Sequence, residues 1–182
     1  DYRCDEEISE IERELKENGF YVHIHKRKEI ENYLLTVKPL TLALQARLRE
    51  RERRTGKFVG MLPNIEALLN ANMEDVRHEV FAQLLARYSD FKKRTAGNLD
   101  SATVNAKLSR EFEARWSQVE GREAMVPGKE ILANLNRQLQ ESCGVTLSDG
   151  VIANQFSRET IPEDLLHLLD FLNQFGQMTA PD

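Results

Sequence analysis

Apolar residues recur at helical spacing through most of this 182-residue chain, and this periodicity constrains the fold more than any other feature. The most regular stretch runs from about Met73 to Lys93. Its single broad apolar face contains Val76, Val80, Phe81, Leu84, Leu85, Tyr88 and Phe91. Asn72 directly precedes this stretch and is predicted to cap it. The pattern therefore predicts a mainly α-helical protein.

Capping residues, prolines and glycines set the bounds of the other expected helices. Asp5 is predicted to cap a first helix, and Asn18-Gly19 to end it. Residues 55–63 and 121–128 each contain two glycines, which predicts loops. Further helices are expected at 40–54, at 63–71, from Asp100 or Ser101 through Trp116, from Pro127 to Gly144, from Ser148 to Phe156, and from a capping box at Thr160–Glu163 to Phe175.

Residues 20–25 follow a different pattern, because apolar and polar or aromatic side chains alternate there. The alternation predicts a short strand, and residues 29–35 are expected to form a short helix or turn. A helix followed by a strand is the second half of a βαβ unit, whose first strand would precede Asp1. We therefore expect part of a longer protein. Residues 1–38 would form an incomplete helix–strand α/β edge, and residues 39–182 a mostly helical region.

The net charge of −5 conceals an uneven distribution. Residues 20–57 contain ten Lys and Arg against four acids, a local net charge of +6, which leaves −11 on the remainder. This distribution argues against a protein that binds nucleic acid over its whole surface, and it is compatible with a local basic footprint.

No stretch of about 18 uninterrupted apolar residues is present, so we expect no membrane span. The acidic N-terminal residues form no apolar signal segment. Cys4 and Cys143 are far apart in sequence, and two cysteines without an export signal favour reduced thiols. These features predict a cytoplasmic protein.

Two other motifs are weaker candidates for a functional site. The segment VPGKE at 126–130 is not a phosphate loop, because six residues separate Gly121 from Gly128 where such a loop has four, and because Glu130 follows Lys129. The chain therefore shows no ATP site, and Lys129 is expected on the surface. His23 and His25 could share a strand face and bind a metal, although two solvent-facing histidines are the more ordinary interpretation.

Glu29 and Glu31 are the best candidates for chemistry, because they follow the cations Lys26, Arg27 and Lys28 at the predicted strand end. Mg²⁺ is commonly bound by one or two carboxylates together with water and substrate phosphates. Such ions activate water for phosphodiester hydrolysis, and nearby cations neutralise phosphate. In open α/β sheets, sites form at the carboxyl ends of strands. A well-solvated junction is the alternative.

The run RLRERERR at 47–54 alternates in charge. Such a run usually forms a solvated helix face, but Arg47, Arg51 and Arg54 are also candidate contacts for nucleic-acid phosphates.

The segments DYRCDEEI at the start of the chain and HKRKEIENYLL at 25–35 resemble the later part of the Toprim domain in overcoming-lysogenization-defect (OLD) nucleases. In that family, an Asp-x-Asp motif ends one strand, and a Glu-Ile-Glu-Asn-Tyr motif comes after it. Asp1 matches the second Asp of the pair, and residues 29–33 match the second motif residue by residue. The later segments PGKEILANLNRQLQ and IPEDLLHLL also resemble the region C-terminal to Toprim in such proteins.

The resemblance implies a Mg²⁺-dependent DNA endonuclease coupled to an ABC-type ATPase and acting in antiviral defence. Asp1, Glu29 and Glu31 would be the metal ligands in the intact protein, with Glu31 preferred over Glu29, and Lys26, Arg27 and Lys28 would lie near phosphate. The family's first catalytic Glu and the first Asp of its pair would lie upstream of this chain. The chain alone is therefore expected to be inactive.

The resemblance also implies the partners. DNA and an upstream ATPase domain are the expected partners, and a second copy of the chain is a further candidate partner. An alternative of another class is a non-catalytic helical module whose basic segment contacts a partner or DNA passively.

Overall fold

A computed structural model describes residues 2–58, 60–95 and 100–179. The described chain is mainly helical, which confirms the expected class. Its elements are the 3-10 helix η1 (Ile30–Leu35) and the α-helices α1 (Asp5–Glu17), α2 (Val37–Thr55), α3 (Ile65–Asp75), α4 (Arg77–Thr95), α5 (Ser101–Trp116), α6 (Val119–Met125), α7 (Gly128–Cys143), α8 (Asp149–Ala153) and α9 (Glu163–Thr179).

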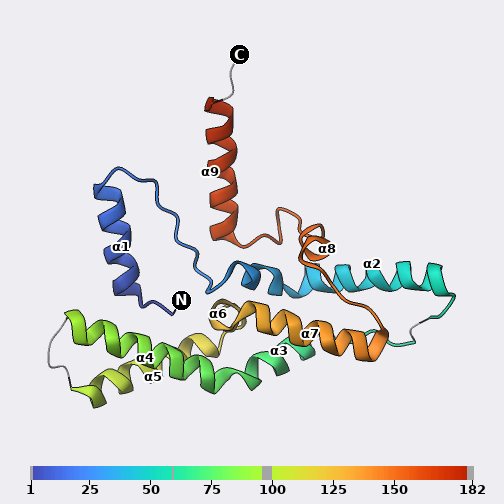
Figure 1. The fold of residues 1–182 in the computed structure, drawn as a ribbon, viewed down its shortest axis with the longest axis horizontal. Helices are drawn as coiled ribbons and strands as arrows, with labels where there is room; N and C mark the ends of the chain where they lie inside the picture. The colour runs from blue at the N-terminus through green and yellow to red at the C-terminus, as the bar shows by residue number, and fades with distance from the viewer. Residues whose placement is uncertain (1, 59, 96–99, 180–182) are drawn as a thin grey trace.

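The core lies where η1 and α2 pack on α3, α7 and α8 (Figure 1). Helices α2, α3 and α7 each bury one stripe at helical spacing, as expected for amphipathic helices around a shared core. The residues with no exposed surface include Leu35, Leu40, Ala43, Val126, Ile131, Leu139 and Ile152. Burial of each large apolar side chain contributes about 1.5–3 kcal/mol to stability.

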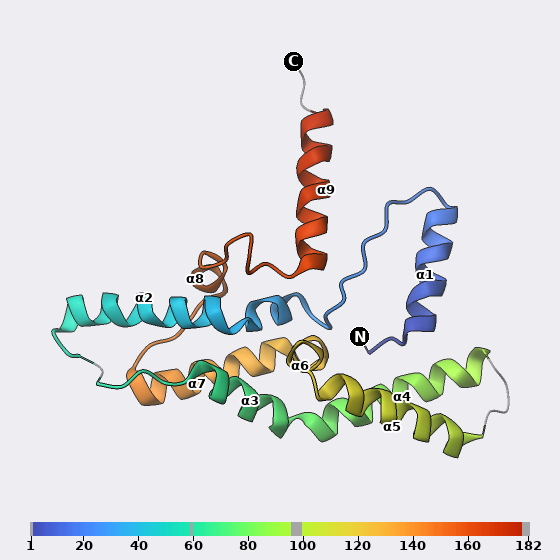
Figure 2. The ribbon, with the colours of Figure 1, turned by 180° about the vertical axis from the view of Figure 1, so that it is seen from behind.

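Helices α4 and α5 form a hairpin that extends from one end of this core (Figure 2). An aromatic group of Phe81, Phe112 and Trp116 packs inside the hairpin, with ring centroids 5.0 and 5.2 Å apart. Helix α1 is attached to α4 by charged groups: Glu7 is buried and pairs with Arg87. Helix α9 stands apart from the other helices, and its C-terminal end points away from them (Figure 1).

Several local signals are confirmed. Asp100 caps α5 by accepting hydrogen bonds from the backbone N–H groups of Ala102 and Thr103. The Ser148 hydroxyl caps α8 in the same way. Gly144 ends α7 in the left-handed conformation, with a φ of 67°. These caps bond within four residues of themselves, so neighbouring residues are enough to predict them.

The strand expected over residues 20–25 does not form. These residues have no regular secondary structure, and no strand is present anywhere in the described part of the chain. A strand is defined by hydrogen bonds to a neighbouring strand, and alternation of side chains cannot supply that neighbour.

The predicted cap at Asn72 is wrong, because α3 continues through this residue to Asp75. Asn72 is buried, and its amide exchanges two hydrogen bonds of 3.0 and 3.1 Å with the amide of Gln138 in α7. The next helix begins only at Arg77. A long-range amide pair therefore determines the role of this asparagine.

The predicted loop at 121–128 is also largely wrong, because residues up to Met125 belong to α6. The Arg122 guanidinium donates to the Trp116 carbonyl at 3.2 Å and to the Asn70 side chain at 3.1 Å. These contacts hold the short helix against the end of α5 and against α3. No described helix is long and apolar enough to cross a membrane.

Candidate functional site

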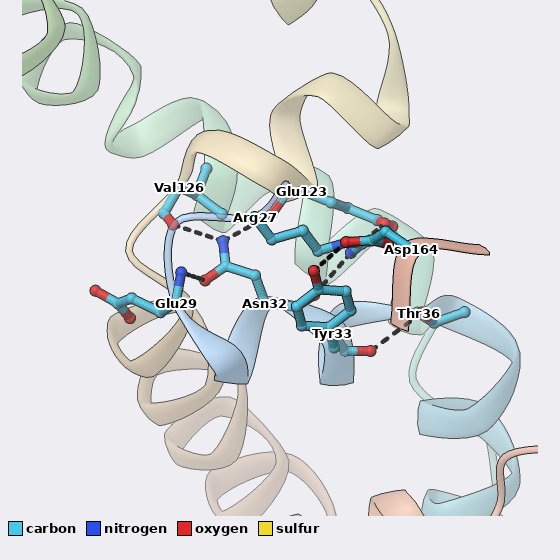
Figure 3. A network of polar contacts seen from close by, with 8 residues as sticks. All are labelled: Arg27, Glu29, Asn32, Tyr33, Thr36, Glu123, Val126 and Asp164. Carbon is cyan, nitrogen blue, oxygen red and sulfur yellow. Dashed lines mark hydrogen bonds and ion pairs between the residues drawn. The ribbon is translucent and has the colours of Figure 1, made fainter. Parts of the chain in front are cut away.

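Residues 27–33 form a buried junction with the corner between α6 and α7, and Asn32 is its centre (Figure 3). The Asn32 amide nitrogen donates to the carbonyls of Glu123 at 2.7 Å and Val126 at 2.8 Å. Its side-chain oxygen accepts from the Glu29 backbone N–H at 3.2 Å. The last carbonyls of a helix lack partners within the helix. Asn32 therefore caps the C-terminal end of α6 from a distant part of the chain.

Glu29 performs the complementary task at the start of α7. Its carboxylate accepts the Lys129 backbone N–H at 3.1 Å, in the first turn of that helix. Pro127, at the cap position, makes no side-chain hydrogen bond to the helix. A carboxylate is favourable there because the N-terminal end of a helix carries partial positive charge.

The close packing of the junction depends on Gly128. A Cβ atom at this position would lie 2.8 Å from the Asn32 backbone nitrogen and closer still to its side-chain oxygen. The Pro-Gly pair that begins α7 is therefore a point of backbone contact with η1.

A nearly buried ion pair lies beside Asn32. One nitrogen of Arg27 is 3.1 Å from the Glu123 carboxylate and also donates to the Asn32 carbonyl at 2.7 Å. Both charged side chains are about one-tenth exposed. Burial raises the pKa of Glu123 above its ordinary value, and Arg27 opposes this rise. Arg27, expected near phosphate, is thus directed into the junction.

Tyr33 joins the junction to α9. Its hydroxyl donates to the Asp164 carboxylate, which also accepts the Lys26 backbone N–H at 3.3 Å. Burial and the Asp164 carboxylate raise the pKa of Tyr33. Burial favours a higher pKa for Asp164, but hydrogen bonds from Tyr33 and two backbone N–H groups outweigh it, and this pKa is lowered. The rings of Tyr21 and Phe171 stack at 3.7 Å and add a second attachment.

We expect the attachment of α9 to weaken at acid pH. The pKa of Asp164 in the folded state lies below its ordinary value of 3.8, so its stabilising contribution is present above that value. The contribution is lost as pH falls through the lowered pKa. NMR shifts of the Leu165 and Leu166 amides will therefore show a step below about pH 4.

Asp164→Asn will remove this step, whereas Asp170→Asn will keep it, because Asp170 pairs with Arg158 instead. An unchanged step in Asp164→Asn would contradict the assignment.

Among the described residues, Glu31 makes fewer contacts with the rest of the fold than Glu29 does. Its carboxylate is 3.5 Å from the Lys129 ammonium group, and that lysine is 74% exposed, as expected for its position. The Glu29 carboxylate is 3.6 Å from the Lys28 ammonium group. Both candidate carboxylates therefore contact Lys129 in the first turn of α7, Glu29 through the backbone N–H and Glu31 through the ammonium group.

The described residues do not form a complete metal site. Among them, no group of three or more His, Cys, Asp or Glu side chains could hold a metal ion. Asp1 lies outside the described residues. His23 and His25 contact each other edge to face at 5.0 Å, and the His25 ring lies 3.5 Å from the Tyr33 hydroxyl.

The cationic run borders a cleft of about 480 Å³ between the N-terminal segment, α1 and the α5–α6 region. Lys26 and Lys28 line it together with Arg3 and Arg115, and Asp5 and Glu12 balance part of their charge. The Lys28 ammonium group lies 4.5 Å from the centre of the Tyr2 ring.

The other predicted phosphate contacts, Arg47, Arg51 and Arg54, are grouped in a different place. They line a smaller cleft between α2 and the end of α7. The charge pattern indicated these arginines, but it contained no signal for Glu123 or Asp164. Both acids lie more than 90 residues from their partners in the junction.

In comparisons with known proteins, no family model, no curated protein and no solved structure matches the chain.

Proposed function

We propose that this chain is the C-terminal Toprim-like and helical portion of a metal-dependent DNA nuclease coupled to an ABC-type ATPase in antiviral defence. The observation that carries the proposal is the position of Glu31. This carboxylate lies on a junction fixed by buried hydrogen bonds, and its one described partner is the exposed Lys129 ammonium group. The match to the Glu-Ile-Glu-Asn-Tyr motif supports the same residue.

The residues of this chain do not fit a whole Mg²⁺ site, so the proposal assigns them part of one. Glu31 would be a ligand, and Glu29 would hold Glu31 in place by fixing η1 to α7. Asp1 and residues supplied by the rest of the nuclease would complete the ligand set. Lys26 and Lys28 would lie along the path of the DNA backbone, where cations neutralise phosphate charge.

In the intact nuclease, Glu31→Gln is expected to abolish Mg²⁺-dependent cleavage while ATP hydrolysis continues. The amide keeps the size of the side chain but loses the charge that a hard cation requires. Glu52→Gln, on the exposed part of α2, will cleave normally and is the matched control. Normal cleavage by Glu31→Gln would remove this residue from the site.

The chain alone allows a direct measurement. Mn²⁺ will broaden the amide signals of residues 29–33 and of Lys129, and Glu31→Gln will abolish the broadening. Broadening that is absent, or that is unchanged in Glu31→Gln, would contradict metal binding at this carboxylate.

A second function, a non-catalytic helical module that contacts DNA or another partner, is favoured by the separate group of arginines on α2. In that case, reversing the charges of Arg47, Arg51 and Arg54 would weaken binding, and chelation of metal would change nothing. The Mn²⁺ measurement distinguishes the two functions.

A further inference from the structure

Arg47, Arg51 and Arg54 are spaced four and three residues apart, so they lie on one face of α2. With the end of α7 they enclose a cleft of about 170 Å³, whose opposite wall contains Gly144 and Thr146. We call this feature the arginine cleft. It is separate from the junction, because Arg51 lies roughly 20 Å along α2 from the N-terminal end of that helix.

The charges in the arginine cleft are not balanced. Arg47 is 2.6 Å from the Glu50 carboxylate and donates to the Thr146 carbonyl at 3.4 Å. Among the described residues, no ion pair involves Arg51 or Arg54. Arg51 is half-buried, and a cation in that position is unfavourable without a counter-charge.

The end of α7 accounts for only part of this arrangement. The C-terminal end of a helix carries roughly half a negative charge, which favours one nearby cation. The last turn is also closed in part by its own backbone, since the Gly144 N–H donates to the Gln140 carbonyl at 3.0 Å. Three guanidinium groups beside one carboxylate and one helix end leave an excess of positive charge.

The volume of the arginine cleft suits a small tetrahedral anion. Its volume equals roughly six water molecules. Gly144 leaves room for a guanidinium group, because a Cβ atom there would lie 3.2 Å from the Arg51 Nε atom. Guanidinium groups bind phosphate through two parallel hydrogen bonds, a geometry that lysine does not provide.

We propose that the arginine cleft binds a phosphate group, supplied either by a nucleic-acid backbone or by free phosphate. Arg51 is the central contact, with Arg47 and Arg54 on either side. The inference does not depend on the proposed nuclease, because it uses neither Glu31 nor a metal.

The test compares Arg51→Ala with Arg49→Ala, an exposed arginine two residues away on the same helix. The Gly144 and Thr146 amides are followed by NMR while inorganic phosphate replaces chloride at constant ionic strength. Phosphate will shift both amides in the unmodified chain and in Arg49→Ala. Its affinity will be about tenfold lower in Arg51→Ala, the loss of one charge-assisted contact.

A short fluorescein-labelled DNA duplex identifies the source of the phosphate group. Weaker duplex binding in Arg51→Ala than in Arg49→Ala supports a nucleic-acid backbone, and equal duplex binding with altered phosphate binding supports free phosphate. Arg51→Lys keeps the charge and the fold, and it will bind phosphate with intermediate affinity. The proposal is overturned if phosphate shifts neither amide, or if Arg49→Ala and Arg51→Ala lose affinity equally. Glu31→Gln will leave phosphate binding unchanged, so failure of this test is distinct from failure of the nuclease proposal.

Discussion

Asn32→Ala is expected to lower the free energy of unfolding by about 3–5 kcal/mol, because it removes the donor that caps α6. The carbonyls of Glu123 and Val126 would then be buried without a partner, and each such group costs about 1–3 kcal/mol. The Glu29 N–H would also lose its acceptor. Urea unfolding followed by far-ultraviolet circular dichroism, which reports on helix content, measures the change.

Asn105→Ala is the matched control, since Asn105 is exposed on α5, and it will change stability by about 0.5 kcal/mol or less. Asn32→Asp keeps the shape of the side chain but places a carboxylate against two carbonyls, and it will be at least as destabilising as alanine. A loss below about 1 kcal/mol in Asn32→Ala would show that water replaces the amide.

Arg27→Met is expected to cost about 3–5 kcal/mol at neutral pH, because it leaves the Glu123 carboxylate buried without its counter-charge. The loss will depend on pH. Burial already raises the pKa of Glu123, and Arg27 is the group that opposes the rise, so the substitution raises this pKa further. Protonation of Glu123 then favours the folded state.

The sign of the pH effect is set by this raised pKa. The stabilising effect of protonation is complete below the ordinary Glu value of 4.5 and is lost as pH rises through the higher folded value. The deficit of Arg27→Met relative to the unmodified chain will therefore shrink as pH falls toward 4.5. Urea unfolding at several pH values measures it.

Combining Arg27→Met with Glu123→Gln removes the buried charge and will recover much of the lost stability at neutral pH. A deficit that is equal at every pH would show that lost packing, and not the uncompensated carboxylate, causes the destabilisation.

The parts of the fold that the sequence predicts are those set by neighbouring residues. Asp100 and Ser148 cap helices through hydrogen bonds within three residues, and Gly144 ends α7 through its own backbone conformation. Asn72 has the same side chain as a good cap, but its partner is Gln138, 66 residues away. Composition and spacing contain no information about such a pair.

In the candidate site, too, the sequence predicts what neighbouring residues determine and does not predict the long-range contacts. The sequence identifies Glu29 and Glu31 as acids beside cations, and it identifies the arginines of α2 by their charge. It does not indicate that Glu29 caps α7, because that contact joins residues 100 apart. The expected strand at 20–25 fails for the same reason, since alternation describes one strand and pairing requires two.

The junction also has a consequence for the order in which the chain folds. Its central hydrogen bonds join Asn32 to residues 91 and 94 positions later, and Tyr33 reaches Asp164 across 131 positions. Closing loops of this length carries an entropic cost before any contact is gained. During synthesis from the N-terminus, residues 27–33 leave the ribosome long before their partners exist. The helices can form locally, but the junction can close only after α6 and α7 have been made, and α9 can attach only after Asp164 has been made.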